Sequence, residues 1–295
     1  MPTLAELCAL AARYADDLNH TVAPLRLRGR ATPAPGEALI MGVVNLSRQS
    51  TYRSSIAPDN AAAIQRGRIL AAQGAHIVDL GAESSTAAAD LVSARRQIDQ
   101  LVPVIEPLAA EGIAVSVESY HPDVVEACLQ AGAAMVNLSG AAADDEVFAT
   151  AAQHDAAVLL CYVPQENVRQ VNDMPLDGVA EQMLASLSPR VQAAREAGVS
   201  GIVIDPGLGF YYGNLTDPAL RTRFQTEQLL QTFRLRSLGV PVCQSLPHAF
   251  DLFTEHYRSA EAYFAVLALL GQADMLRTHE VGPVHAVTRA MGISD

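Results

Sequence analysis

The sequence of 295 residues predicts an α/β fold, a (β/α)8 barrel with an N-terminal helical extension. Eight short apolar runs, typical of strands buried on both faces, alternate with alanine-rich amphipathic stretches typical of helices. Eight such units in about 255 residues match a barrel of this kind in number and length. A doubly wound open sheet is the alternative, but no Gly-x-Gly-x-x-Gly follows the first run to support a dinucleotide-binding version of it.

The chain divides into an N-terminal segment, 1–36, and a barrel, 37–295. Apolar residues at helical spacing over 3–18 predict a helix packed outside the core, and the prolines and glycine of 21–36 predict a connector. The predicted strands are 38–45, 75–82, 113–118, 134–138, 156–162, 201–205, 240–245 and 274–279. The predicted helices of the barrel are 59–73, 88–111, 122–131, 143–153, 177–197, 219–238, 258–271 and 282–291.

Residues that begin and end helices lie at the borders of these stretches. Helix-start signals occur at Pro58-Asp59, His121-Pro122-Asp123 and Ser259-Ala260-Glu261. Glycines that suit helix ends follow at Gly74, Gly112, Gly132 and Gly198.

Charge and cysteine content narrow the class of protein. The formal net charge is −12, which disfavours non-specific nucleic-acid binding because that binding needs a basic face. The four cysteines are far apart and form no Cys-x-x-Cys pair, which indicates reduced thiols and a cytoplasmic protein. The sequence has neither a signal peptide pattern nor an apolar run long enough to span a membrane, so no membrane partner is expected.

The stretch from Gly201 to Phe210 reads Gly-Ile-Val-Ile-Asp-Pro-Gly-Leu-Gly-Phe. Its apolar residues predict a strand, which must end at Asp205 because Pro206 cannot donate a backbone hydrogen bond. A carboxylate therefore lies at the carboxyl end of a buried strand, the end where α/β proteins bind ligands. The alternative is that Asp205 only caps the following turn, since aspartate is common in turns.

Each of the eight predicted strands ends on a polar side chain. In a barrel the carboxyl ends of the strands form one rim, so these side chains are expected to meet there. Buried charges must be paired or must meet a ligand, which makes this rim a candidate binding site. In chain order the residues are Asn45, Asp79 with Glu83, Glu118, Asn137, Tyr162, Asp205, Ser245 with His248 beyond it, and Arg277 with His279.

The residue types predict a divided site. Carboxylates and amides suit the polar edge of a flat heterocycle, because a carboxylate accepts two parallel hydrogen bonds. Asn45, Arg277 and His279 are expected to lie together, since the first and last strands of a closed barrel are neighbours, and they suit an anion such as phosphate. No His/Asp cluster has the sequence spacing of a zinc site, and no Gly-x-Ser-x-Gly elbow is present.

Six ordered motifs resemble those of dihydropteroate synthases, within the pterin-binding barrel superfamily. Together they span residues 38–281, nearly the whole predicted barrel. The motifs are Ile40-Met41-Gly42-Val43-Val44-Asn45, the stretch 74–85 around Asp79, Val115-Ser116-Val117-Glu118-Ser119, the stretch 131–137 ending at Asn137, Ile204-Asp205-Pro206-Gly207-Leu208-Gly209-Phe210, and Leu276-Arg277-Thr278-His279-Glu280-Val281.

The resemblance implies a transferase of a folate-type pathway, which joins a hydroxymethyl-dihydropterin diphosphate to p-aminobenzoate and releases pyrophosphate. It implies Mg²⁺ as cofactor and Asn45 as its ligand, with Asn45, Arg277 and His279 on the diphosphate. It implies that Asp205 and Asn137 hold the pterin and that Glu118 stands in for the family's aspartate. The implied catalytic residues are Asp205, Glu118, Arg277 and His248, and the implied substrate-binding residues are Asn45, Glu118, Asn137, Asp205, Phe210, Ser245, His248, Arg277 and His279.

The departures from the family pattern fall on the acceptor side. The first loop reads Ser47-Arg48-Gln49-Ser50-Thr51, without the acidic residue that helps to order the acceptor, and the second loop lacks its arginine at Ala87. The seventh-strand lysine is missing, with His248 in its place, and the Gly-Lys after Phe210 is replaced by Tyr211-Tyr212. These changes predict a pterin-binding barrel whose amine acceptor differs from p-aminobenzoate.

Two other functions remain open at this point: a methyltransferase that uses a folate methyl donor with a corrinoid partner, and a non-catalytic paralogue that binds a pterin or a protein. The apolar stretch 261–270 and the family resemblance further predict a homodimer. The alternative is that this stretch is buried under the N-terminal segment.

Overall fold

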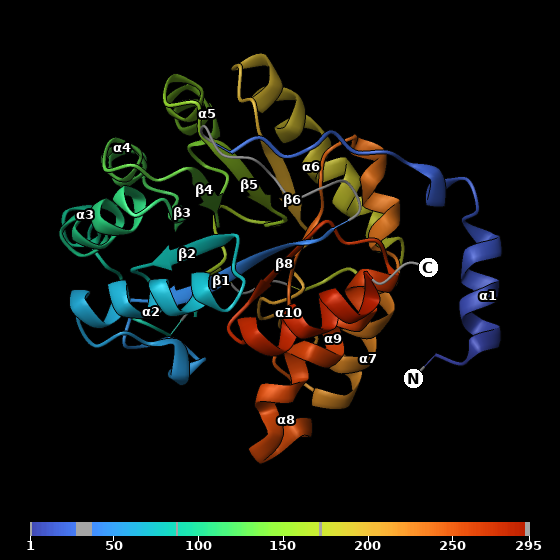
Figure 1. Cartoon of the computed structure of the whole chain (residues 1–295). Helices are drawn as coiled ribbons and strands as arrows, with labels where there is room; N and C mark the ends of the chain where they lie inside the picture. Colours follow the sequence, from blue (N-terminus) through green and yellow to red (C-terminus); the bar gives the residue numbers. More distant parts are fainter. Residues whose placement is uncertain (1, 28–36, 87, 171–172, 293–295) are drawn as a thin grey trace.

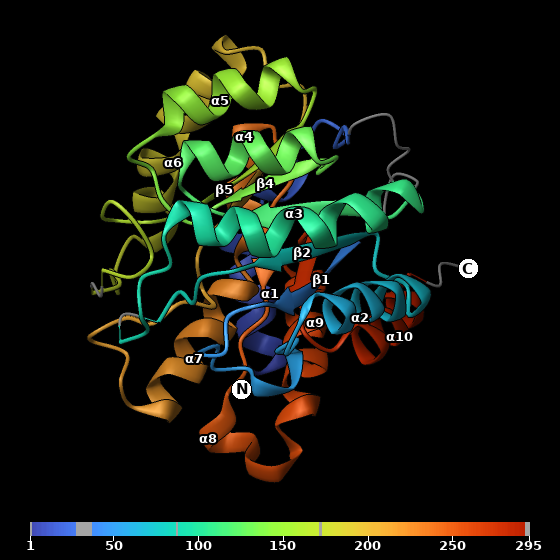
Figure 2. The same ribbon diagram turned by 90° about the vertical axis from the view of Figure 1, so that its left-hand side faces the viewer.

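The computed structural model describes residues 2–27, 37–86, 88–170 and 173–292, and its core is eight parallel strands. Helices surround these strands (Figures 1 and 2). Every observed strand lies inside a predicted run. The strands are β1 Leu39–Asn45, β2 Ile77–Gly81, β3 Ala114–Glu118, β4 Met135–Leu138, β5 Ala157–Cys161, β6 Ile202–Asp205, β7 Cys243–Ser245 and β8 Met275–Thr278.

The strands form a barrel and not an open sheet. They pair in the order β6-β5-β4-β3-β2-β1-β8-β7, so β1 lies between β2 and β8. The two outer strands of this order also meet, through a parallel bridge between Ile204 and Val242. There the backbone N–H of Ile204 donates to the carbonyl of Pro241 at 3.0 Å. The predicted (β/α)8 barrel is confirmed, and the open-sheet alternative is wrong.

The helices cover the outside of the barrel, as Figure 2 shows for α3, α4 and α5. Two predicted stretches are each divided in two: 219–238 is α7 followed by a 3-10 segment, Thr232–Leu238, and 3–18 is α1 followed by a 3-10 turn, Asp17–Asn19. The short α8, Phe250–Phe253, was not predicted, and the 3-10 segment η4, Thr254–Ser259, overlaps the predicted stretch 258–271 only at its last two residues. The helices are α1 Leu4–Arg13, α2 Asn60–Ala72, α3 Ala94–Ala110, α4 Pro122–Gln130, α5 Asp144–Gln153, α6 Val179–Glu196, α7 Pro218–Leu229, α8, α9 Ala260–Leu270 and α10 Val281–Met291. Among the described residues, no helix combines the length and apolarity needed to cross a bilayer.

The N-terminal segment contributes to the barrel core. Leu25 and Leu27 are buried among the side chains that fill the barrel interior. The predicted connector therefore includes packed residues before position 28, and its remainder, 28–36, lies outside the described residues. The backbone of Arg26 approaches β6 closely, because a Cβ on Gly201 would lie 2.2 Å from the Arg26 carbonyl oxygen.

Replacing Gly201 by alanine is expected to lower the free energy of unfolding by about 2 kcal/mol, because the new methyl group overlaps backbone that cannot move alone. Urea unfolding of the purified variant measures this. The matched control is Gly282→Ala in α10, where a Cβ has ordinary contact with Gln73 at 3.9 Å, and this change is expected to stabilise the helix slightly. Equal free energies of unfolding for Gly201→Ala and Gly282→Ala would contradict the close approach of the Arg26 backbone to Gly201.

Most apolar residues of α9 are already used inside the chain. Phe264, Ala265, Leu267 and Ala268 are buried, while Leu270 is exposed. The helix packs mainly on α10, α7 and η4. Its apolar character therefore comes largely from packing against these C-terminal elements, and the alternative of cover by the N-terminal segment is wrong. The homodimer stays a prediction.

Candidate functional site

The two-residue period of the strands decides which side chains meet inside the barrel. Val203 and Met275 lie in the interior cluster, so Asp205 and Arg277, two positions further along their strands, also face the interior. Five further residues lie two or four positions after interior residues of their own strands and so face the same way: Asn45, Asp79, Glu118, Asn137 and Ser245. On β5 the period selects Cys161, and Tyr162 turns outward into the outer apolar core. The expectation that Tyr162 belongs to the rim is therefore wrong.

Arg277 lies at the centre of the site. Its guanidinium pairs with the carboxylate of Asp79 at 2.8 Å and with that of Glu118 at 3.0 Å. The side-chain amide of Asn137 donates to the same oxygen of Asp79 at 3.0 Å. Because β8, β2, β3 and β4 each supply one of these residues, the cluster ties half of the barrel rim together.

Asp79 was expected at the rim but was not assigned a role. Its side chain is fully buried, and its Oδ1 has no hydrogen-bond partner among the described residues. A buried carboxylate needs compensation, and Arg277 supplies the positive charge. Asp79 thus orients Arg277 and Asn137 from inside the barrel.

Glu118 carries an unusual pKa. Burial raises the pKa of its carboxyl group, Arg277 opposes this shift, and Asp79 adds to it, so the pKa lies at about 7. At neutral pH, Glu118 is therefore divided between its protonated and ionised forms, a property frequent at functional sites.

This pKa predicts how stability depends on pH. The folded protein retains the proton on Glu118 up to about pH 7, while in the unfolded chain the group titrates near its usual value of 4.5. The folded state therefore binds more protons between these values, and the free energy of unfolding is expected to fall as the pH rises from 4.5 to 7. Urea unfolding over this range should show a shallower decrease for Glu118→Gln. An identical slope in variant and parent would contradict the assignment.

Asp205 lies behind the cavity wall and holds it in place. Its Oδ1 accepts the backbone N–H of Gly207 at 2.7 Å, and its Oδ2 accepts the N–H and the hydroxyl of Ser245 at 3.1 and 2.7 Å. Burial raises its pKa, and the bonds from Ser245 and Gly207 oppose that shift. The turn-capping alternative is thus present in the structure, and a contact between Asp205 and a substrate stays a prediction.

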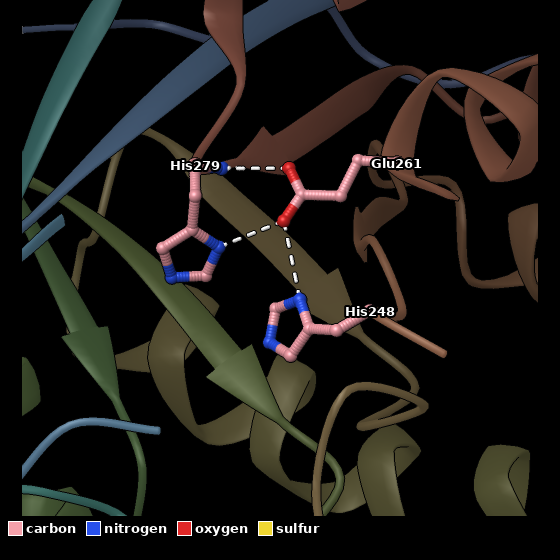
Figure 3. Close-up of side chains that lie close together, drawn as sticks. All are labelled: His248, Glu261 and His279. Atoms are coloured by element: carbon pink, nitrogen blue, oxygen red, sulfur yellow. Dashed lines mark hydrogen bonds and ion pairs between the residues drawn. The ribbon is translucent and has the colours of Figure 1, made fainter. Parts of the chain in front are cut away.

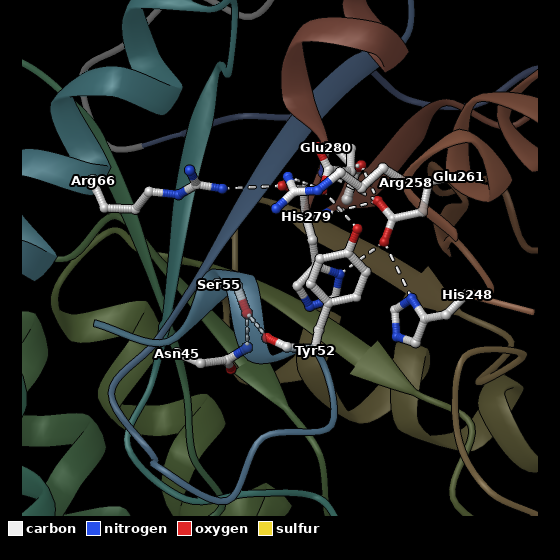
Figure 4. Close-up of polar contacts among 10 residues, drawn as sticks. Asn45, Tyr52, Ser55, Arg66, His248, Arg258, Glu261, His279 and Glu280 are labelled. Atoms are coloured by element: carbon white, nitrogen blue, oxygen red, sulfur yellow. Dashed lines mark hydrogen bonds and ion pairs between the residues drawn. The ribbon is translucent and has the colours of Figure 1, made fainter. Parts of the chain in front are cut away.

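The residues predicted to bind an anion include Asn45 and His279, and Figure 4 shows the polar contacts around them. The amide of Asn45 donates to the hydroxyl of Ser55 at 2.6 Å, which leaves its carbonyl oxygen available to a ligand. Tyr52 stacks on the imidazole of His279, with ring centroids 4.2 Å apart. Tyr52 comes from the first loop, where the sequence has no periodic pattern to mark it.

His248 and His279 both turn toward Glu261 of α9 (Figure 3). The Nδ1 atoms of the two imidazoles lie 3.2 and 2.9 Å from the same carboxylate oxygen, Oε1. Sequence reasoning missed Glu261, although a single carboxylate among the apolar residues of 260–270 was a signal. The absence of a zinc-site spacing in the sequence did not reveal this cluster, because sequence spacing does not report on residues that meet only in the fold.

Arg169 was also missed. It reaches from the segment between β5 and α6 to the second loop, where it donates to the carbonyls of Ser84, at 2.7 Å, and of Ala89. It also lies 3.9 Å from Glu83. A cation from another part of the chain therefore orders the loop whose own arginine is absent.

A cavity of about 180 Å³ opens at the rim between these groups. Eight of the nine predicted substrate-binding residues line it, and the ninth, Asp205, does not. The eight are Asn45, Glu118, Asn137, Phe210, Ser245, His248, Arg277 and His279. Tyr211 and Arg221 also line the cavity.

Comparison with known proteins agrees with this geometry. The family profile of pterin binding enzymes matches residues 41–279. The dihydropteroate synthase type-2 of Escherichia coli is 30% identical in an alignment of 256 residues that covers 83% of this chain and 92% of that protein.

Two solved structures are similar over most of their length. A dihydropteroate synthase of Coxiella burnetii in complex with pteroic acid has 25% identity and a TM-score of 0.72, covering 90% of this chain and 96% of that one. The Xanthomonas albilineans dihydropteroate synthase with 4-aminobenzoic acid has 27% identity and a TM-score of 0.71, covering 86% and 92%. The chain therefore belongs to the pterin binding enzyme family, in which these relatives are dihydropteroate synthases.

Proposed function

We propose that this protein is a transferase of the dihydropteroate synthase type, which joins a hydroxymethyl-dihydropterin diphosphate to an amine and releases pyrophosphate. The observation that carries the proposal is the position of Arg277. It contacts Asp79 and Glu118 on one side and lines the same cavity as Asn45 and His279 on the other. The guanidinium of Arg277 thus borders both a polar pocket suited to a heterocycle and the side chains proposed to bind the diphosphate.

The pterin is assigned to the part of the site that contains the carboxylates of Glu118 and Asp205 and the side-chain amide of Asn137. Asn137 is held by Asp79, so its carbonyl oxygen and amide have a fixed orientation at the cavity wall. When the C–O bond to the diphosphate breaks, the methylene carbon of the pterin becomes cationic. The ionised carboxylate of Glu118 favours that cation, because charge developed in a water-poor site is stabilised by fixed opposite charge. Asp205 maintains the wall through Ser245.

The leaving group is assigned to the anion half. Arg277 and His279 bind the diphosphate, and the positive charge of Arg277 stabilises the departing pyrophosphate. The free carbonyl oxygen of Asn45 fits Mg²⁺, which prefers oxygen ligands and takes few of them from a protein when phosphates supply the others. When bound, Mg²⁺ would neutralise charge on the pyrophosphate.

The acceptor is the least family-like part of the proposal. His248, at the place of the missing lysine, is turned to Glu261, and so its Nδ1 is unavailable to an acceptor. Arg221 lines the cavity and pairs with Asp251 at 3.0 Å, which provides a cation near the mouth for an acceptor that carries a carboxylate. The proposed acceptor is an amine, either p-aminobenzoate or a different one.

The test is pyrophosphate release by the full-length protein with the pterin diphosphate, Mg²⁺ and single amines, with the adduct identified by mass. We expect release that requires an amine, and slower turnover with p-aminobenzoate than in ordinary synthases. Turnover of p-aminobenzoate at the ordinary rate would contradict the altered acceptor. Calorimetric binding of the pterin diphosphate without turnover of any amine would favour the non-catalytic alternative, and methyl transfer from a methylated folate would favour the methyltransferase.

We also propose a homodimer in the cytoplasm. All four cysteines are free thiols, and only Cys8 is exposed, which suits a reducing compartment. Leu270 at the end of α9 is 54% exposed and provides an apolar contact at the predicted face. Light scattering of the purified protein measures the oligomeric state, and a monomer at micromolar concentration would contradict the dimer.

A further inference from the structure

The cluster of His248, Glu261 and His279 has the composition of a metal site. One ligand atom from each residue lies within 4.8 Å of the other two. Both imidazoles direct the same atom, Nδ1, to the same carboxylate oxygen, at 3.2 and 2.9 Å. Three such donors, two nitrogens and one oxygen, match the sets that bind Zn²⁺ or Fe²⁺ in proteins.

The charge of the cluster favours a cation. Glu261 is fully buried. A buried carboxylate needs a compensating positive charge. Within the described residues, the ion pairs of Glu261 are with these two histidines and with no arginine or lysine.

The carboxylate is held in place independently of the two imidazoles. Its second oxygen, Oε2, accepts the hydroxyl of Thr278 and the backbone N–H groups of His279 and Glu280, the latter two at 2.8 and 3.2 Å. Oε1 is therefore presented to the histidines in a fixed orientation. A metal ligand oriented by other hydrogen bonds in this way is typical of protein metal sites.

The rings of Tyr52 and Phe250 pack against the two histidines of the cluster. The cavity gives access to the cluster. Tyr52 stacks on His279, and Phe250 lies with its ring centroid 5.1 Å from that of His248. Both histidines line the cavity, while Glu261 lies behind them. An ion could therefore enter from the cavity and keep positions open toward it.

We propose that Nδ1 of His248, Nδ1 of His279 and Oε1 of Glu261 bind a divalent transition-metal ion of the Zn²⁺ or Fe²⁺ type, with the remaining coordination positions open to the cavity. Binding requires each neutral imidazole to carry its proton on Nε2. This site is distinct from the Mg²⁺ proposed at Asn45, because imidazole nitrogens are poor ligands for Mg²⁺.

The test uses Co²⁺ as a coloured probe, added to the chelator-treated full-length protein without any pterin. We expect one Co²⁺ per chain with visible d–d absorption, displaced by Zn²⁺ and unaffected by excess Mg²⁺. His248→Ala and Glu261→Gln are each expected to weaken Co²⁺ binding by about 100-fold or more. The matched control is the exposed pair Glu255 and His256, whose nearest charged atoms are 3.7 Å apart, and Glu255→Gln with His256→Ala should leave the affinity unchanged.

Several outcomes would overturn the proposal: no absorption with the parent protein, Co²⁺ binding that survives His248→Ala and His279→Ala, or binding that is lost in the exposed control pair. Thermal unfolding without metal shows whether each variant is folded, and His248→Ala keeps the test valid if Glu261→Gln does not fold. Because no substrate is present, the result is independent of the proposed transferase activity.

Discussion

Arg277→Met is expected to reduce amine-dependent pyrophosphate release by about 100-fold or more, and to lower the free energy of unfolding by about 3 kcal/mol at neutral pH. The change removes the cation that pairs with Asp79 and Glu118 and leaves two carboxylates close together in a buried place. It also removes the positive charge assigned to the departing pyrophosphate. Single-turnover kinetics and urea unfolding measure the two effects separately.

Two further variants make this prediction specific. Arg277→Lys keeps the charge but contacts fewer oxygens, so it should recover more stability than activity. Arg258→Met removes an arginine that is 55% exposed and pairs with Glu280 at 2.9 Å, and because its guanidinium can still be solvated in the parent protein, the loss should be less than about 1 kcal/mol. A similar loss of stability for Arg258→Met and Arg277→Met would contradict the central position of Arg277.

Asp205→Ala is expected to lower the free energy of unfolding by about 3 kcal/mol and to abolish detectable turnover. The substitution leaves the N–H of Gly207 and the N–H and hydroxyl of Ser245 without their acceptor in a buried place. The Gly207 turn and the end of β7 would then lose their connection, and the cavity wall its shape. Urea unfolding measures the loss of stability, amine-dependent pyrophosphate release measures the loss of turnover, and calorimetry measures binding of the pterin diphosphate.

Ser245→Ala separates the two roles of Asp205. It removes one of the three donors and leaves the carboxylate in place, so the expected loss is about 1 kcal/mol. If pterin binding persists in Ser245→Ala and disappears in Asp205→Ala, the carboxylate is needed beyond that single contact. If Asp205→Ala retains both stability and pterin binding, the assigned position of Asp205 is wrong.

The barrel could be predicted from sequence because its signals are local. A run such as 201–205 is apolar up to its final aspartate, stops before a proline and is followed by a glycine-rich turn, and each of these features lies within ten residues. Eight repeats of this pattern leave few alternative folds. The polar residues at the strand ends were predicted on the same basis, and the strand period placed all but Tyr162 inside.

The missed residues depend on contacts between distant parts of the chain. Glu261 belongs to a helix outside the barrel, yet it meets His279, eighteen positions away, and His248 across a loop. Arg169 orders a loop about eighty positions earlier. No periodic pattern links such pairs, because the folded paths of the intervening segments determine whether their side chains meet.

By itself, the sequence determined the number and order of the strands and the polar residues at their ends, because hydrophobic periodicity and turn chemistry act over a few neighbouring residues. Only the tertiary structure decided how those residues are used. Asp205 supports the wall through Ser245, Arg277 is shared by two carboxylates, and His248 turns from the acceptor side to Glu261. The physical reason is that a buried charge takes whichever partner the completed barrel places within reach.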